Sequence, residues 1–276
     1  MESYEKLVDK KKFVGNQPII FNKKNYDSSK TYYTTFKLDG QRHLMLVSDS
    51  GNSLITSKME FKKLFLPKVS KEFNGTLLDG ELFNGRFYAF DILFFKGIDI
   101  RKQKFLDRLE TLLSFTKKIR SKKLVVKEYN VSGSLCENFI SLKKKFSKEM
   151  ENGIVDGIIF VQDSEYNSKI LKWKPKHLLS IDFKIKKLPE NKFELLVHTG
   201  KPFSTKGYPK IGITDVSEKD YKLYPDGSIV EFIFNGKKFI PIKHRIDKVK
   251  PNYIVTILSN FEQIIRPLDL EKFLCK

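Results

Sequence analysis

The sequence predicts an α+β fold in which antiparallel sheets with flanking helices precede a small closed β-barrel. Three observations support this fold class. Short apolar and β-branched runs broken by turn pairs fill residues 17 to 100, and two helical patterns fill residues 101 to 150. An all-strand pattern follows Pro175. We therefore expect a larger domain over residues 1–175 and a smaller one over residues 176–254.

The two helical patterns repeat apolar residues every three or four positions. The first pattern, residues 101 to 119, places these side chains on one face: Phe105, Leu109, Leu112 and Leu113. The second pattern, residues 134 to 150, also places its apolar side chains on one face: Leu135, Phe139, Leu142, Phe146 and Met150. Ser134 suits the N-cap of the second helix.

Strand patterns return after the helices. They cover residues 153–162 and 168–174, and then 180–188, 192–199, 228–234 and 237–243. Asn235-Gly236 joins the last two and is typical of a tight hairpin. A meander of this size suits a small barrel. The tail, residues 255–276, has a helical pattern divided by Pro267, and we expect it to pack back on the larger domain.

Charge and composition narrow the classes of function. The 276 residues carry 52 Lys and Arg against 33 Asp and Glu, a formal charge of +19. Such an excess favours a polyanionic partner, with nucleic acid as the leading candidate. A base-composition bias in the gene would also enrich lysine, and the chain has one alanine, Ala89. Charge alone leaves both explanations open.

Several common devices are absent from the sequence. The charged start excludes a secretory signal, and no apolar run approaches the about 20 residues needed to cross a bilayer, so we expect a soluble, intracellular protein. Cys136 and Cys275 stand far apart and lack metal-ligand spacing, so neither a disulfide framework nor a zinc site is indicated. The chain has no GxGxxG, GxxxxGK[ST] or HExxH motif.

Asp-Gly pairs mark four expected hairpin turns, at residues 39–40, 79–80, 156–157 and 226–227. The first three have charged groups beside them, as in KLDGQR, LLDGELF and VDGIIFV. In LKWKP, Lys172 and Lys174 alternate around Trp173, which places both ammonium groups on one face of a strand. An anion between them would relieve their repulsion.

These residue types suit phosphoryl or nucleotidyl transfer. A lysine becomes a nucleophile when neighbouring cations and burial lower its pKa, and Arg42, Lys172 and Lys174 are candidate neighbours for Lys37. Glu81 and Asp156 offer the carboxylate oxygens that Mg²⁺ prefers alongside phosphate. Positioning and charge neutralisation do most of the catalytic work in such reactions.

Five stretches in this order resemble the motif set of the covalent nucleotidyltransferase superfamily, which holds DNA ligases, RNA ligases and mRNA capping guanylyltransferases: KLDGQR (37–42), LLDGELF (77–83), FYAFDIL (87–93), DGIIF (156–160) and LKWKP (171–175). Three more resemble the capping branch: FVGNQPIIF (13–21), with Val14 where proline is commoner, SIDFKI (180–185) and HRIDKVKPN (244–252). The resemblance covers residues 13 to 252. It implies a nucleotidyltransferase domain followed by an OB-fold.

The resemblance implies mRNA guanylyltransferase activity with GTP as substrate. Lys37 would attack the α-phosphorus of GTP and release pyrophosphate, and the 5′-diphosphate end of a nascent RNA would then accept the GMP from a lysyl-N-GMP intermediate. Mg²⁺ or Mn²⁺ is the implied cofactor, held by Glu81 and Asp156. Expected partners are a separate RNA triphosphatase and the transcribing RNA polymerase, with no membrane.

The resemblance also assigns roles to single residues. Catalytic roles fall to Lys37, Lys172, Lys174 and Asp247. Arg42 and Glu81 would contact the ribose, and Phe87 would stack on guanine with Ile159 opposite. Lys172 and Lys174 would hold the α-phosphate, while Arg245, Asp247 and Lys248 would close over pyrophosphate. The expected nucleotide-binding set is Asp39, Arg42, Glu81, Phe87, Ile159, Lys172, Lys174, Arg245 and Lys248.

Two other functions remain open. An ATP-dependent polynucleotide ligase would share Lys37, Glu81 and the lysine pair, and differs mainly in the three capping-type stretches. A non-catalytic RNA-binding OB-fold protein would use the basic surface, but would not need Lys37 before the turn. The expected location is the nucleus, or a cytoplasmic viral factory or virion for a viral protein.

Overall fold

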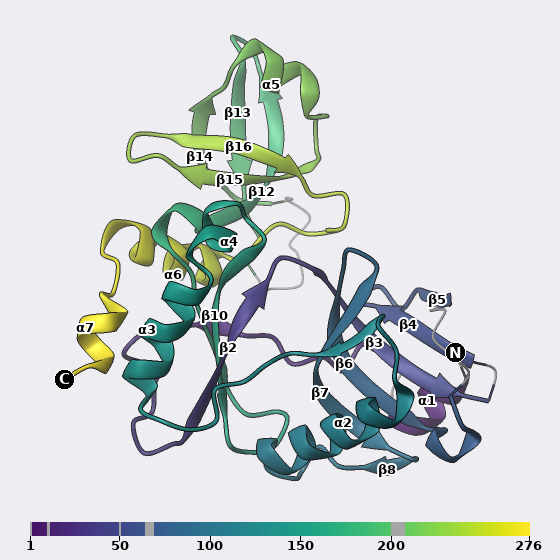
Figure 1. Ribbon diagram of the computed structural model, residues 1–276. Coiled ribbons are helices and arrows are strands. Elements are labelled where there is room, and N and C mark those ends of the chain that lie inside the picture. Colours follow the sequence, from purple (N-terminus) through teal and green to yellow (C-terminus); the bar gives the residue numbers. More distant parts are fainter. Residues whose placement is uncertain (1, 10–11, 50, 64–68, 200–207) are drawn as a thin grey trace. The chain divides into compact units, whose positions relative to one another are not determined.

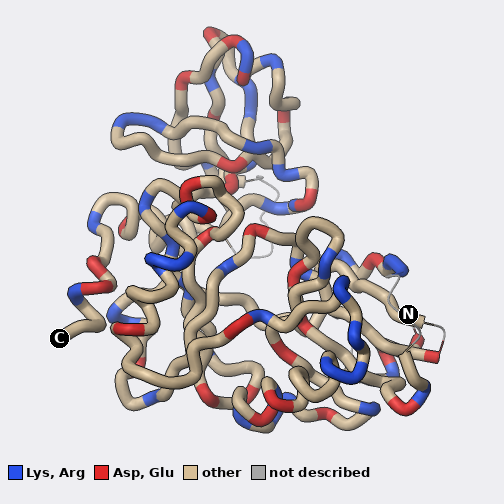
Figure 2. Tube along the Cα trace, in the orientation of Figure 1, with Lys and Arg blue, Asp and Glu red and all other residues tan. Residues whose placement is uncertain are grey.

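The computed structural model describes residues 2–9, 12–49, 51–63, 69–199 and 208–276. The chain divides into two compact units, drawn together in Figure 1. The first unit comprises residues 1–173 and 274–276, and the second comprises residues 174–273. Helices and antiparallel strands mix in the first unit, which confirms the α+β fold class. Basic and acidic residues are interleaved along both units (Figure 2).

Two sheets form the framework of the first unit. The larger sheet has the strand order β5-β4-β3-β6-β7-β8, with β9 parallel to β7. Its strands are β3 (Gln41–Ser48), β4 (Gly51–Thr56), β5 (Phe61–Lys63), β6 (Thr76–Phe83), β7 (Arg86–Phe95), β8 (Ile98–Asp99) and β9 (Leu124–Val126). The smaller sheet has the order β1-β11-β10-β2. Its strands are β1 (Ile19–Ile20), β2 (Tyr32–Leu38), β10 (Val155–Gln162) and β11 (Ile170–Trp173).

The helices pack on these sheets through the apolar faces that the sequence predicts. Leu112 and Phe115 of α2 are fully buried against Leu78 and Ile92 of the larger sheet. Leu113, expected on the same face, is instead 49% exposed. Ser134 begins α3 with the expected N-cap, since its hydroxyl accepts the Glu137 N–H in a capping box. The helices of this unit are α1 (Glu2–Val8), α2 (Phe105–Ile119), α3 (Leu135–Lys145) and α4 (Ser147–Glu151). The single helix expected over residues 134–150 is therefore two helices that meet at Phe146.

None of the four Asp-Gly pairs forms a hairpin between paired strands, which corrects the prediction. Asp226-Gly227 lies between α5 (Glu218–Leu223) and β15 (Ile229–Phe234). Asp39-Gly40 links β2 to β3, and these strands belong to different sheets. Asp79-Gly80 lies within β6 at a register irregularity opposite β7. Asp156-Gly157 lies within β10 at another irregularity. A Cβ on Gly80 would approach the Phe87 ring to 2.5 Å, so close packing explains this glycine.

The second unit is built on a five-stranded antiparallel sheet in the order β14-β13-β12-β15-β16. Its strands are β12 (Ser180–Leu188), β13 (Lys192–Leu196), β14 (Lys210–Asp215), β15 (Ile229–Phe234) and β16 (Phe239–His244). The Asn235-Gly236 hairpin is confirmed, since the Asn235 N–H donates to the Lys238 carbonyl at 3.2 Å. The unit also contains α5 (Glu218–Leu223), α6 (Ile254–Ile265) and most of α7 (Leu270–Leu274).

The tail is helical as predicted, but its packing differs from the expectation. Ile257 of α6 is buried in the core of the second unit with Phe183 and Phe232. Asn260 donates to the Ser180 carbonyl at 2.9 Å. Only residues 274–276 group with the first unit. The apolar stripe of α6 has a matching core in its own unit, which is why the helix packs there.

Cys136 of α3 and Cys275 form a disulfide, with Cα atoms 5.1 Å apart. This corrects the interpretation that no disulfide is indicated. Sequence spacing could not reveal the pair because 139 positions separate them. In the part of the chain that the structure describes, no helix is long and apolar enough to cross a membrane.

Candidate active site

The smaller sheet places Lys37, Ile159 and Lys172 on one face. Lys37 of β2 lies opposite Gly157 of β10, while Ile159 of β10 lies opposite Lys172 of β11. Directly opposed residues share a face, and so do residues two apart along one strand. Ile20, from the FVGNQPIIF stretch, pairs with Lys172 at the sheet edge. Four of the stretches, KLDGQR, DGIIF, LKWKP and FVGNQPIIF, therefore meet in this sheet.

Lys37 is partly buried and paired with a carboxylate. Its Nζ lies 2.7 Å from Asp156 Oδ2, and the two side chains are 18% and 15% exposed. Burial lowers the pKa of Lys37, but the charges of Asp156 and Glu81 outweigh it, so this pKa is raised. Asp39 adds to the same effect, while its N–H donates to the Ile154 carbonyl at 3.0 Å. The expectation that cations depress this pKa is wrong for this state of the protein.

The larger sheet supplies Arg42 and Glu81, which lie opposite each other on β3 and β6. Arg42 forms a bidentate pair with the buried Asp79, at 3.0 Å from Nε to Oδ1 and 2.5 Å from Nη2 to Oδ2. The pKa of Arg42 is raised because Asp79 outweighs the effect of burial. Asp39-Gly40 connects β2 of the smaller sheet directly to β3 of the larger sheet. Lys37 and Arg42 are therefore only five residues apart in sequence although they lie on different sheets.

Lys37, Asp156, Arg42 and Glu81 form a charged cluster. Lys127 also belongs to it, although no sequence motif predicted a role for this residue. It follows β9, is 4% exposed, and its Nζ lies 3.6 Å from Glu81 Oε2. Burial lowers the pKa of Lys127, and the charge of Lys37 acts in the same direction, whereas Glu81 raises it. No motif marks this lysine in KKLVVKEYN. A lysine flanked by apolar β-branched residues was the one available signal, and it is weak in a lysine-rich chain.

Phe87 is fully buried in the core of the larger sheet, so it cannot stack on a base as expected. Phe90 lies where β7 departs from regular pairing with β6, between Ala89 and Asp91. The ring centroid of Phe90 lies 5.4 Å from the Arg42 guanidinium carbon and 5.6 Å from Lys127 Nζ. Ile159 is half-buried beside Tyr33 and Phe105. Phe90 therefore reaches the charged cluster, as do Phe36, whose ring centroid lies 4.9 Å from Lys127 Nζ, and Phe13, whose ring centroid lies 5.8 Å from the Arg42 guanidinium carbon.

The predicted metal ligands fit a hard cation only with help from other oxygens. Glu81 Oε2 is buried and makes no hydrogen bond within the described residues. Asp156 is occupied by Lys37. No group of three or more His, Cys, Asp or Glu side chains in the described part of the chain is arranged to hold a metal. Two carboxylates suit Mg²⁺ when phosphate and water oxygens complete its shell.

The remaining predicted residues, Lys174, Arg245, Asp247 and Lys248, belong to the second unit. Arg245 pairs with Asp247 at 2.8 Å and with the buried Asp182 at 2.9 Å. A hydrogen bond from Arg245 lowers the pKa of Asp247 to about 2, although partial burial opposes it. Arg245 thus joins the SIDFKI and HRIDKVKPN stretches within this unit.

The catalytic-domain model of the mRNA capping enzymes matches residues 2–176, which include Lys37, Glu81, Asp156 and Lys172. The chain belongs to the mRNA capping enzyme family. The mouse mRNA-capping enzyme is 28% identical over 94% of this chain and 48% of its own length. The capping enzyme subunit alpha of Schizosaccharomyces pombe is 27% identical over 91% of this chain and 76% of its own.

The chain spans about half the length of the vertebrate capping enzymes it matches, 48% for mouse and 49% for zebrafish. African swine fever virus capping enzyme is 30% identical over 58% of this chain and 19% of its own length. Among solved structures, a Lig E DNA ligase superposes on 84% of this chain and 98% of its own, with a TM-score of 0.45 and 19% identity.

Proposed function

We propose that this capping-family chain is an mRNA guanylyltransferase that uses GTP and the 5′-diphosphate end of RNA. The observation that carries the proposal is the partly buried Lys37 in a capping catalytic domain, 2.7 Å from Asp156 and on the same sheet face as Lys172. Lys172 can bind the phosphate that Lys37 attacks, and Lys37 becomes a nucleophile once its pair with Asp156 is weakened.

In the first proposed step, Lys37 Nζ gives one proton to solvent and attacks the α-phosphorus of GTP. A P–N bond forms as the bond from the α-phosphorus to the bridging oxygen breaks, and pyrophosphate leaves. Asp156 orients the amine, and Lys172 neutralises the α-phosphate charge. Lys174, Arg245, Asp247 and Lys248 are assigned to the phosphates in the same proposal. In the second step, a terminal oxygen of the RNA diphosphate attacks, the P–N bond breaks, and Lys37 regains its proton.

The nucleoside would be held by the larger sheet. Arg42 and Glu81 contact the ribose, and Glu81 Oε2 supports this because it is buried without a hydrogen-bond partner among the described residues. Phe90 replaces Phe87 as the aromatic contact to guanine. Glu81 and Asp156 would hold Mg²⁺ or Mn²⁺. The ion would neutralise charge on the triphosphate when bound.

The second unit is proposed to be an OB-fold barrel over residues 176–254. Contacts between its first and last strands in sheet order support closure. Thr214 Oγ1 of β14 donates to the Phe239 carbonyl of β16 at 2.7 Å, and Lys238 Nζ donates to the Asp215 carbonyl at 2.9 Å. A separate RNA triphosphatase and the transcribing polymerase are proposed partners. The nucleus, or a viral factory or virion for a viral protein, is the proposed location.

Label retention on the denatured chain tests the function. The protein is incubated with Mg²⁺ and α-labelled GTP or ATP, and Lys37→Ala should lose all retained guanylate because no other side chain supplies the amine. Lys58→Ala, which changes an exposed lysine on a loop, should retain it. The adduct should be labile in hot acid, as a phosphoramidate is. Adenylate in place of guanylate would indicate a ligase, and no label would indicate a binding protein.

A further inference from the structure

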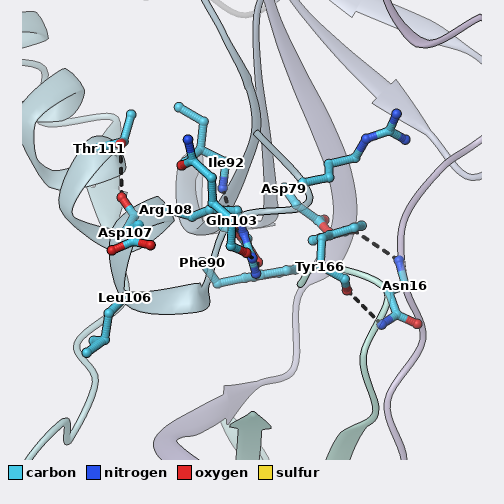
Figure 3. A network of polar contacts seen from close by, with 12 residues as sticks. Asn16, Asp79, Phe90, Ile92, Gln103, Leu106, Asp107, Arg108, Thr111 and Tyr166 are labelled. Carbon is cyan, nitrogen blue, oxygen red and sulfur yellow. Dashed lines mark hydrogen bonds and ion pairs between the residues drawn. The ribbon is translucent and has the colours of Figure 1, made fainter. Parts of the chain in front are cut away.

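Tyr166 lies in the loop between β10 and β11 and joins three segments of the first unit. It is 3% exposed. Its hydroxyl donates to Asp79 Oδ2 of β6 and accepts the Asn16 N–H at 3.1 Å. Arg42 Nη2 of β3 lies 3.3 Å from the same oxygen. Figure 3 shows Tyr166 beside Asp79, with two contacts to Asn16. No motif in the sequence assigns this tyrosine a role.

The network uses most of the hydrogen-bond donors of Arg42. A guanidinium has five N–H donors. Nε and Nη2 bind Asp79, the second Nη2 hydrogen faces Tyr166, and Nη1 donates to the Asn16 carbonyl. Among the residues that the structure describes, none binds the second Nη1 hydrogen, which is left for a ligand, and the Arg42 side chain is 17% exposed. The direction of that last donor is set by the groups that hold the other four.

We propose that Tyr166 is a positioning residue that aims the remaining Nη1 donor of Arg42 at a hydroxyl of the nucleotide sugar. The inference rests on the proposed function, in which Arg42 contacts the ribose. Asp79 is fully buried, so the Tyr166 hydroxyl is a donor at a position that bulk solvent does not reach. Asn16 Nδ2 holds the tyrosine loop through the Tyr166 carbonyl at 3.0 Å and the Ser168 carbonyl at 2.7 Å. Burial raises the pKa of Tyr166, which keeps its hydroxyl a neutral donor.

Sugar discrimination tests this role. Rates of lysyl-GMP formation are measured for GTP, 2′-deoxy-GTP and 3′-deoxy-GTP at several concentrations. Wild type should prefer GTP over at least one deoxy analogue, and Tyr166→Phe should reduce that preference by about tenfold, since a hydrogen bond to a charged group contributes roughly this much. Arg42→Gln should lose the same preference. Adding Tyr166→Phe to Arg42→Gln should reduce it no further.

Two further variants serve as a control and as an alternative test. Tyr32→Phe removes another buried tyrosine hydroxyl of the same unit, which bonds to Gln162 Nε2 at 2.9 Å, and should leave the preference unchanged. Should Tyr166→Phe fail to fold, Asn16→Ala releases the tyrosine loop, keeps the hydroxyl, and should reduce the preference in the same direction.

Each outcome decides the proposal. A purely structural tyrosine would slow all three nucleotides equally in Tyr166→Phe, and an unchanged preference would overturn the positioning role while the function stands. Wild type that forms the adduct without any sugar preference would also overturn it. Wild type that retains no GMP at all would overturn the proposed function together with this inference.

Discussion

At the scale of single residues, the central finding is that Lys37 is held as an ammonium by carboxylates. Asp156 and Glu81 raise its pKa against the effect of burial. The attacking form of a lysine is the neutral amine, so in the proposed reaction GTP binding has to weaken these pairs before chemistry. A cation that engages Asp156 would do so. Under this proposal, the carboxylate keeps Lys37 protonated until substrate binds.

The pH profile of adduct formation tests this storage. Asp156→Asn removes the carboxylate that stabilises the ammonium, so the pKa of Lys37 should fall and the rising limb of the rate profile should move to lower pH. The rate of label retention in a single turnover is measured at several alkaline pH values. The quantity compared between variants is the pH at which the rate rises, not the maximal rate. Glu151→Gln, an exposed acid at the end of α4, should leave it in place. An unmoved limb in Asp156→Asn would mean that another group sets this pKa.

At the scale of elements, α2 is fastened to the larger sheet by a buried ion pair. Arg108, which is 1% exposed, binds Asp91 of β7 through two contacts of 2.8 and 2.9 Å. Its Nη1 donates to the carbonyls of Gln103 and Ser164. Burial raises the pKa of Asp91, and Arg108 opposes this effect. These contacts connect the start of α2 and the loop that carries Tyr166 to the strand that carries Phe90.

Removing one partner of this pair should be strongly destabilising. Arg108→Ala leaves Asp91 buried without a counter-charge, which costs about 3–5 kcal/mol in free energy of unfolding. Urea unfolding followed by circular dichroism gives this value. Arg101→Ala, which breaks the more exposed pair with Asp99, should cost about 0–1 kcal/mol. Similar losses in the two variants would contradict the view that Arg108 anchors α2.

At the scale of the whole chain, the Cys136–Cys275 disulfide closes a covalent loop that contains the entire second unit. Both ends of that unit are therefore tied to the first: one by the main chain after Trp173, the other by the disulfide next to Leu274. A cross-link over so many residues reduces the conformational freedom of the unfolded chain.

Loss of the disulfide should lower stability without abolishing the fold. Cys275→Ser should unfold about 2–4 kcal/mol more easily than the oxidised wild type, as expected for a long closed loop. Calorimetry without reductant measures the difference in Tm. Reductant should lower the Tm of wild type to that of the variant and leave the variant unchanged. Equal melting of the oxidised wild type and Cys275→Ser would show that the cross-link contributes nothing.

The sequence by itself determined α2, α3, the helical tail, most strands, the Ser134 cap and the Asn235-Gly236 hairpin, because these depend on periodicity and on chemistry within a few residues. It did not predict the short helices α1 and α5. Ordered motifs also pointed to the family. Tertiary structure decided which strands pair. As a result, Asp39-Gly40 connects two sheets, and Asp79-Gly80 and Asp156-Gly157 lie at irregularities within strands, where the sequence predicted hairpins. It likewise decided that Phe87 is core while Phe90, Lys127 and Tyr166 reach the charged cluster. Those facts depend on contacts between distant segments, whose geometry no local pattern encodes.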